Sequence, residues 1–222
     1  MKLIIANSKN WFKINKKIEN KHEIAVVTNP KKLNLNFLKK YKPEFIFFPH
    51  WSWIIPKEIY KNYKCIVFHT APLPYGRGGS PIQNLILKGF KSSPVCALKV
   101  VQELDAGPIY AKKNLNLNGS LSEILFRLNV IVNDLISELI RFLPTPKKQT
   151  GEVYSFKRLT SKNNLIPNNI TLDSFFDRIR MLDEDSYPNA FINYKNFRIE
   201  FQNAEIIKGQ IVCKSKIILN KD

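Results

Sequence analysis

Four short apolar runs near the amino terminus constrain the fold of this chain more than any other feature. Each is long enough for one strand, and polar or helix-like stretches separate them; the runs cover residues 2–6, 22–28, 44–49 and 64–69. Strands that read as nearly continuous apolar runs are covered on both faces, as in parallel sheets. Residues 34–41 and 56–63 are expected to form short connecting helices. The pattern predicts an α/β protein with a Rossmann-like, doubly wound, mostly parallel sheet.

The middle of the chain continues the same alternation. A helix is expected over residues 80–88, followed by strands over residues 95–102 and 109–117. Ser120 and Glu123 then form a capping-box pattern, which predicts the start of the longest amphipathic helix, ending near residue 143.

The amino-acid composition changes after Pro144, where proline, lysine and asparagine become frequent. The tail is expected to hold one short helix near residues 172–182 and several short strands, the last two joined by a hairpin at Lys208 and Gly209. We therefore expect a catalytic domain over residues 1–150 and a small C-terminal α+β module over residues 151–222.

The net charge of +17 arises mainly from lysines scattered along the chain. Together with the many Asn and Ile residues, this scatter is typical of an AT-rich coding sequence, so we expect no nucleic-acid partner. A surface for a polynucleotide remains the alternative, and a positive field would also attract a small phosphate-bearing substrate.

The cysteine pattern and the lengths of the apolar runs exclude other classes of protein. The three cysteines follow no metal-ligand spacing, and they read as reduced core residues of a cytoplasmic protein. No apolar run approaches the roughly 20 residues that a membrane-spanning helix needs. We expect no metal site and no membrane partner.

Two loops carry the residue types that proton chemistry needs. His69 ends an apolar run and passes into a loop stiffened by prolines, in which Arg77 lies between glycines. Asp105 lies on a second turn, directly after Leu104 and shortly before Gly107. A histidine at the carboxyl end of a buried strand, with an aspartate to orient it, is suited to proton transfer.

The residue pattern of these loops resembles that of the N10-formyltetrahydrofolate-dependent formyltransferase superfamily. The resemblance rests on His69, on residues 73–83, on residues 104–107 and on the long helix that follows. It implies transfer of a formyl group from N10-formyltetrahydrofolate to an amine. His69 and Asp105 would be two members of the family's Asn-His-Asp set. His69 would hydrogen-bond the developing oxyanion or relay the proton, and Asp105 would fix its tautomer or hold a water.

One position departs from the family pattern, because Val67 stands where the family has asparagine. A valine donates no hydrogen bond, and the loss of one such donor costs about 3 kcal/mol in comparable sites. His50, Asn84 or a backbone amide could take its place, or the chain could be slow or inactive. We name His50 as the third catalytic candidate.

The resemblance also implies which residues bind the two substrates. The folate loop corresponds to residues 51–55, whose tryptophans could alternatively be core residues; the cofactor-binding candidates are Trp51, Ser52, Trp53, Ile54 and Leu104. Substrate-binding candidates follow on the next loop and helix, namely Tyr75, Arg77, Gly78, Gln83 and Asn84. An ion pair with a carboxylate is the alternative for Arg77, and plain solvation is the alternative for the last two.

Chain length guides the choice of acceptor. A tail of about 70 residues is shorter than the barrel domain of the tRNA-modifying relatives, so the sequence favours a nucleotide sugar N-formyltransferase of polysaccharide biosynthesis. The expected acceptor is a UDP- or dTDP-linked 4-amino-4,6-dideoxy sugar, and a homodimer is expected. The alternatives are a methionyl-tRNA formyltransferase-like or other amine formyltransferase, a module acting on a carrier-bound aminoacyl group, and a non-catalytic RNA-binding relative.

Overall fold

A computed structural model describes residues 1–220, and they divide into two compact units. The first unit comprises Met1–Gly78, Ser93–Leu115 and Leu125–Ser155. The second comprises Gly79–Ser92, Asn116–Ile124 and the described chain from Phe156 onward. The functional boundary near residue 150 stays a prediction.

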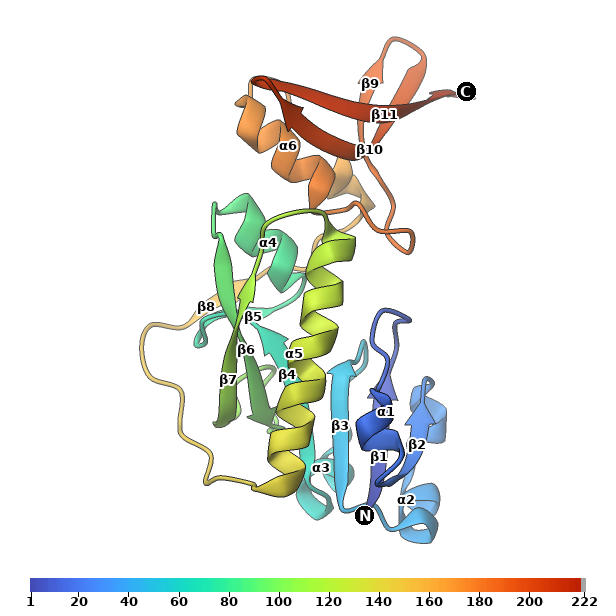
Figure 1. Ribbon diagram of the computed structural model, residues 1–222, viewed down its shortest axis with the longest axis vertical. Coiled ribbons are helices and arrows are strands. Elements are labelled where there is room, and N and C mark those ends of the chain that lie inside the picture. Colours follow the sequence, from blue (N-terminus) through green and yellow to red (C-terminus); the bar gives the residue numbers. More distant parts are fainter. Residues whose placement is uncertain (221–222) are drawn as a thin grey trace. The chain divides into compact units, whose positions relative to one another are not determined.

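The first unit is built on a six-stranded sheet with the strand order β2-β1-β3-β4-β6-β7 (Figure 1). The strands are β1 (Lys2–Asn7), β2 (Glu23–Val27), β3 (Phe45–His50), β4 (Cys65–Thr70), β6 (Ser92–Lys99) and β7 (Ile109–Asn116). β1 pairs in parallel with β2 and β3, and β3 pairs in parallel with β4. β6 runs antiparallel to β4. The predicted mostly parallel α/β sheet is confirmed.

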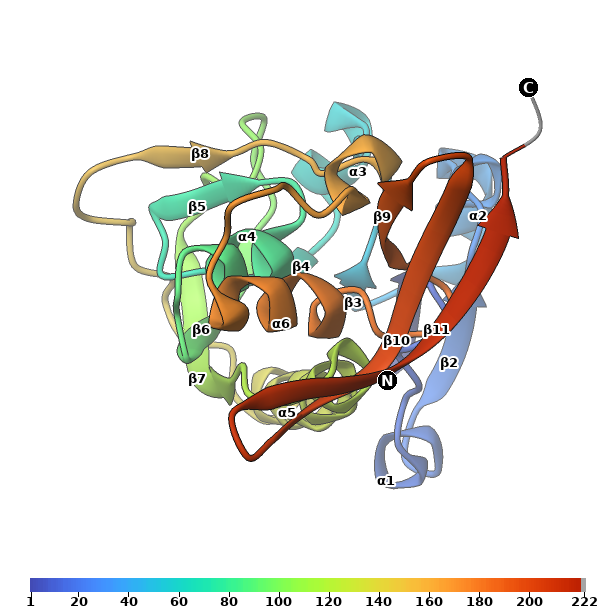
Figure 2. The same cartoon turned by 90° about the horizontal axis from the view of Figure 1, so that it is seen from above.

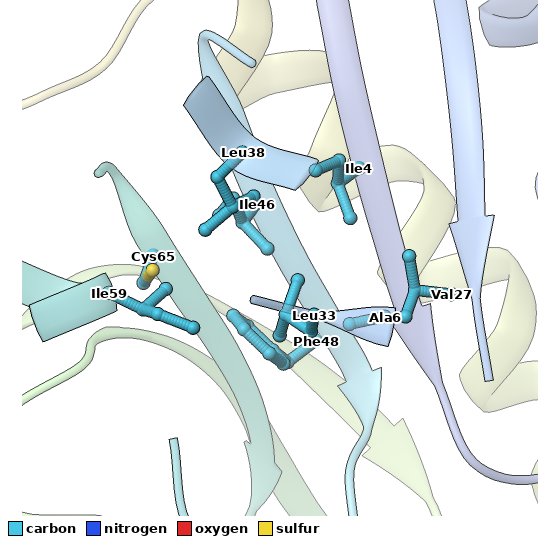
Figure 3. Close-up of a cluster of buried hydrophobic side chains, with 9 residues drawn as sticks. All are labelled: Ile4, Ala6, Val27, Leu33, Leu38, Ile46, Phe48, Ile59 and Cys65. Atoms are coloured by element: carbon cyan, nitrogen blue, oxygen red, sulfur yellow. The ribbon is translucent and has the colours of Figure 1, made fainter. Parts of the chain in front are cut away.

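Helices cover both faces of this sheet because its strands are apolar on both sides. The helices are α1 (Lys16–Glu19), α2 (Leu35–Tyr41), α3 (Lys57–Asn62) and α5 (Leu121–Arg141). Viewed from above, α3 and the long α5 lie on opposite faces of the sheet (Figure 2). Figure 3 shows the core on the side of α2 and α3, where Leu38 and Ile59 pack with Ile46 and Phe48.

The start of α5 forms as its sequence predicts. The backbone N–H of Ser120 donates to Glu123 Oε2 at 2.8 Å, and the N–H of Glu123 donates to Ser120 Oγ at 3.3 Å. These reciprocal bonds satisfy two amides that a helix start otherwise leaves unpaired. The predicted capping box is confirmed.

The second unit contains α4 (Pro81–Leu87), α6 (Leu172–Arg180) and an antiparallel sheet in the order β11-β10-β9. Its strands are β9 (Ala190–Tyr194), β10 (Phe197–Ile207) and β11 (Gln210–Leu219). The turn between β10 and β11 has positive φ at Lys208 and Gly209, at 50° and 75°, as a type I′ hairpin requires. β10 continues as one long strand through a register shift between Gln202 and Glu205.

β5 (Tyr75–Gly78) pairs with β8 (Tyr154–Phe156) in a two-stranded sheet that belongs to the first unit except for Phe156. β5 was expected to be a loop, because its glycines and the preceding prolines are turn formers. Long-range pairing with β8 and stacking of Tyr75 on Tyr154, with ring centroids 4.8 Å apart, hold it extended instead. No helix within residues 1–220 is both long and apolar enough to cross a bilayer.

The thiols of the chain differ in burial, which predicts a difference in reactivity. Burial raises the pKa of the Cys65 thiol to about 12 and that of Cys96 to about 11, so at pH 8 about one Cys65 thiol in 10⁴ is ionised. Cys213 is only partly buried. Iodoacetamide at pH 8 should therefore label Cys213 first, and the other two only after denaturation. Peptide mass spectrometry over time measures this, and equal rates at all three thiols would contradict it.

Candidate active site

His69 is the next-to-last residue of β4, and both nitrogens of its ring face protein acceptors. Nε2 lies 2.7 Å from the carbonyl oxygen of Gly76. Because a carbonyl can only accept, Nε2 carries the hydrogen in this contact. Nδ1 lies 3.4 Å from Oδ2 of Asp105, and the two side chains are only 7% and 9% exposed. The structure thus brings together the two residues that the sequence analysis proposed as the catalytic pair.

The turn that carries Asp105 is held in a conformation that most residues avoid. Asp105 has a φ of 53°, a left-handed conformation that costs about 1–2 kcal/mol for residues with a side chain. Its Oδ2 also accepts a hydrogen bond of 2.9 Å from the backbone N–H of Gly78. At Gly107 a Cβ atom would lie 1.7 Å from the carbonyl oxygen of Lys99, so only glycine fits there. Close backbone packing therefore fixes where the carboxylate sits.

Arg77 is held by an amide, whereas the alternative considered for it was an ion pair with a carboxylate. Its Nε and Nη2 donate to Oε1 of Gln149 at 3.0 and 2.8 Å. The Nε2 of Gln149 donates to the carbonyl oxygens of Asp105 and Gly107 at 2.7 and 2.9 Å. Gln149 lies in a proline- and lysine-rich stretch outside every recognised motif, so no sequence signal identified it. The role of Arg77 toward substrate stays a prediction.

Val67 and His50 lie on the two neighbouring parallel strands. Val67 packs against the buried clusters on both sides of it, so an apolar side chain suits this position. His50 and His69 each follow the registered pair Phe48–Val67 by two residues, which places both at the carboxyl ends of adjacent strands. His50 Nδ1 lies 2.9 Å from Ser8 Oγ. Compensation for the missing asparagine by His50 stays a prediction.

The proposed folate loop exposes apolar side chains. Trp53 is 43% exposed and Ile54 81% exposed, and Leu104 on the Asp105 turn is 64% exposed. Trp51 is half-buried and packs edge-on against Phe48, so the core alternative fits Trp51 but does not fit Trp53. Ligand sites are commonly lined by apolar side chains on loops such as these, which follow strands of the sheet.

The polar neighbours on these loops and on α4 are already engaged. The Oγ of Ser52 lies 2.9 Å from Ser8 Oγ. Gln83 is buried, and its Nε2 donates to the carbonyl of Met181 at 3.4 Å. The side-chain amide of Asn84 bonds three backbone carbonyls at 3.0–3.1 Å, those of Gly79, Ser80 and Lys157. These contacts give Gln83 and Asn84 structural roles within the second unit, and their contact with substrate stays a prediction. No cluster of metal-ligating side chains occurs among residues 1–220.

Both halves of the chain match known families. Residues 2–123 match the model described as "Formyl transferase", and residues 161–218 match "Methionyl-tRNA formyltransferase, C-terminal domain". The methionyl-tRNA formyltransferase of Campylobacter lari is 34% identical over 210 residues, which cover 91% of this chain and 67% of that protein. The chain spans about three fifths to two thirds of the length of the curated relatives it matches.

Two solved structures bear on the acceptor. The structure of methionyl-tRNA formyltransferase from Clostridium thermocellum has a TM-score of 0.92 and 43% identity, covering 99% of this chain and 100% of that one. A sugar N-formyltransferase from Shewanella has a TM-score of 0.67 at 17% identity, covering 94% and 99%, which shows a shared fold alone.

These comparisons correct the expected acceptor. The nucleotide-linked amino sugar is wrong, and so is the expectation of no nucleic-acid partner, because the relatives with substantial identity are methionyl-tRNA formyltransferases. Tail length does not exclude a tRNA acceptor, because a methionyl-tRNA formyltransferase of similar size exists and the tail itself matches the C-terminal domain of these enzymes. The resemblance read from the loops around His69 and Asp105 is confirmed at the level of the family: this chain belongs to the formyl transferase family.

Proposed function

We propose that this chain transfers a formyl group from N10-formyltetrahydrofolate to the amino group of methionyl-tRNA. The observation that carries the proposal is the buried His69–Asp105 pair in a chain whose two parts match formyl transferase models, the second of them specific to methionyl-tRNA formyltransferases. The folate supplies the formyl carbon. Trp53, Ile54 and Leu104 offer exposed apolar surface for its flat ring.

In this reaction, His69 and Asp105 would stabilise the charge on the formyl oxygen and move one proton. The neutral amine attacks the formyl carbon, and negative charge develops on the formyl oxygen. The bond from that carbon to N10 of the folate then breaks, the amine loses a proton, and N10 gains one and leaves as tetrahydrofolate. The imidazole of His69 donates a hydrogen bond to that oxygen or relays the proton. The carboxylate of Asp105, 3.4 Å from Nδ1, orients the ring. Burial of both side chains strengthens these interactions because water is largely excluded.

The charge of the chain supports a tRNA acceptor. A net charge of +17 favours association with a polyanion, and binding through phosphate contacts weakens steeply as salt rises. Arg77, whose guanidinium is paired with a neutral amide, keeps its positive charge available for a phosphate or carboxylate.

The test uses purified chain, N10-formyltetrahydrofolate and two acceptors, with products read by mass spectrometry. We expect formyl-methionyl-tRNA from charged initiator tRNA and no product from a UDP-linked 4-amino sugar. The KM for tRNA should rise by about tenfold or more between 50 and 200 mM salt, whereas the KM for the folate should change little. Salt-dependent tRNA binding without any transfer would support a non-catalytic RNA-binding protein. No transfer and no tRNA binding would overturn the proposal.

A further inference from the structure

Gln149 uses every hydrogen-bonding position of its side chain to join two loops of the first unit. Its Oε1 accepts two hydrogen bonds from Arg77, and its Nε2 donates one each to the carbonyls of Asp105 and Gly107. An arginine can only donate and a carbonyl can only accept, so the contacts themselves fix the orientation of the amide. One side chain therefore contacts both the Arg77 strand and the Asp105 turn.

The backbone places Gln149 independently of these contacts. Two residues earlier, Lys147 forms a pair of backbone hydrogen bonds with Ile109, at 2.7 and 2.9 Å. This bridge ties the segment to the first residue of β7, and Ile109 follows Gly107 by two residues. The side chain therefore reaches the Asp105 turn from a fixed point, with little freedom left to lose.

From this arrangement we propose that Gln149 is the positioning residue that sets the Asp105 carboxylate against His69. This inference rests on the proposed function for its kinetic test. Gln149 acts through other groups: it holds the left-handed Asp105 backbone by its carbonyl. It also holds Arg77, whose neighbour Gly78 donates to the same carboxylate. Loss of the Gln149 side chain therefore releases both the Asp105 backbone and the Arg77 strand, which together position the carboxylate.

The chemistry demands an amide of this length. Glutamate would keep the two bonds from Arg77, but it has no donors and would set its charge against the carbonyls of Asp105 and Gly107. Leucine of similar volume would make none of the four bonds. Asparagine has the same donors and acceptors but is one methylene too short to span both loops.

The kinetic test compares the Gln149→Leu and Gln149→Glu variants with the wild-type protein, all as full-length chains. We expect kcat for formyl transfer to fall about 10- to 100-fold, as for a misplacement of about 1 Å, with the KM for N10-formyltetrahydrofolate nearly unchanged. In an Asp105→Asn background the same Gln149→Leu change should cost less than about threefold, because a residue that acts through Asp105 has nothing left to position. Thr150→Val, at the exposed neighbouring residue, is the control and should keep wild-type kinetics.

A second measurement needs no substrate. In NMR spectra, the Gly78 amide and the His69 ring signals should shift in Gln149→Leu and stay in place in Thr150→Val, with both variants folded by circular dichroism. Unchanged signals and unchanged kcat, or a full loss in the Asp105→Asn background, would overturn the role of Gln149. If wild type transfers no formyl group but the signals shift, the positioning role stands and the proposed function is what fails.

Discussion

Replacement of His69 by alanine is expected to lower kcat for formyl transfer by about 10²- to 10⁴-fold, the usual contribution of a general acid–base group. The ring supplies the hydrogen bond and the proton relay at the formyl group, and alanine supplies neither. KM for tRNA should change little, because a residue 7% exposed offers no surface to a macromolecule. Single-turnover kinetics with charged initiator tRNA and N10-formyltetrahydrofolate measure the effect.

Of the other two histidines of the chain, His22 provides a matched control and His50 provides a separate test. His22→Ala should keep wild-type activity, and each variant should retain the far-ultraviolet circular dichroism of the parent. His50→Ala tests whether His50 compensates for the asparagine that Val67 replaces. A loss of about tenfold or more there would support compensation, and unchanged turnover would reject it. Wild-type activity in His69→Ala would reject the assignment of the catalytic histidine.

Replacement of Gly107 by alanine is expected to lower the free energy of unfolding by about 3 kcal/mol or more, at the upper end of overpacking effects. The new Cβ atom would lie 1.7 Å from the carbonyl oxygen of Lys99 and 2.9 Å from its carbonyl carbon. Backbone atoms cannot move aside as a flexible side chain can, so the bond between Lys99 N–H and the Pro108 carbonyl, 2.9 Å long, must break or shift. Urea denaturation measures the loss of stability.

The same substitution at Gly89 separates crowding from backbone strain. Gly89 has a φ of 79°, and a Cβ atom there would meet no described atom within 4 Å outside its own chain neighbours. Alanine at this position therefore adds only the strain of a left-handed residue, about 1–2 kcal/mol. A similar loss at both glycines would show that the Lys99 contact contributes nothing to the cost at Gly107.

The site could be predicted where local pattern and chemistry agree. His69 ends a buried strand and Asp105 lies in a glycine turn, so each was visible as a polar residue punctuating an apolar pattern. Their meeting at 3.4 Å depends on the antiparallel pairing of β6 with β4 and on the path of the turn after β6, which no local pattern shows. The fold followed from the same apolar runs.

What the sequence did not reveal depends on long-range contacts or on comparison with relatives. Gln149 contacts residues more than 40 positions away and stands in a stretch with no periodicity, so no local signal marks it. β5 forms only because β8 returns to pair with it. The acceptor was predicted wrongly because tail length does not distinguish the two classes of relative: a methionyl-tRNA formyltransferase of similar size exists.

The carbonyl oxygen of Gly76 occupies the hydrogen-bond donor of His69 that a ligand would use. It is a planar carbonyl oxygen, 2.7 Å from Nε2, and so it is the same kind of acceptor as the oxygen of a formyl group. A ligand carbonyl that reaches His69 exchanges one such bond for another, and the net gain from the exchange is close to zero. Without a ligand, the Gly76 carbonyl oxygen thus takes the place that the formyl oxygen would have at Nε2 of His69. Its preference for the true one must come from charge that develops only during the reaction, which the peptide carbonyl never acquires.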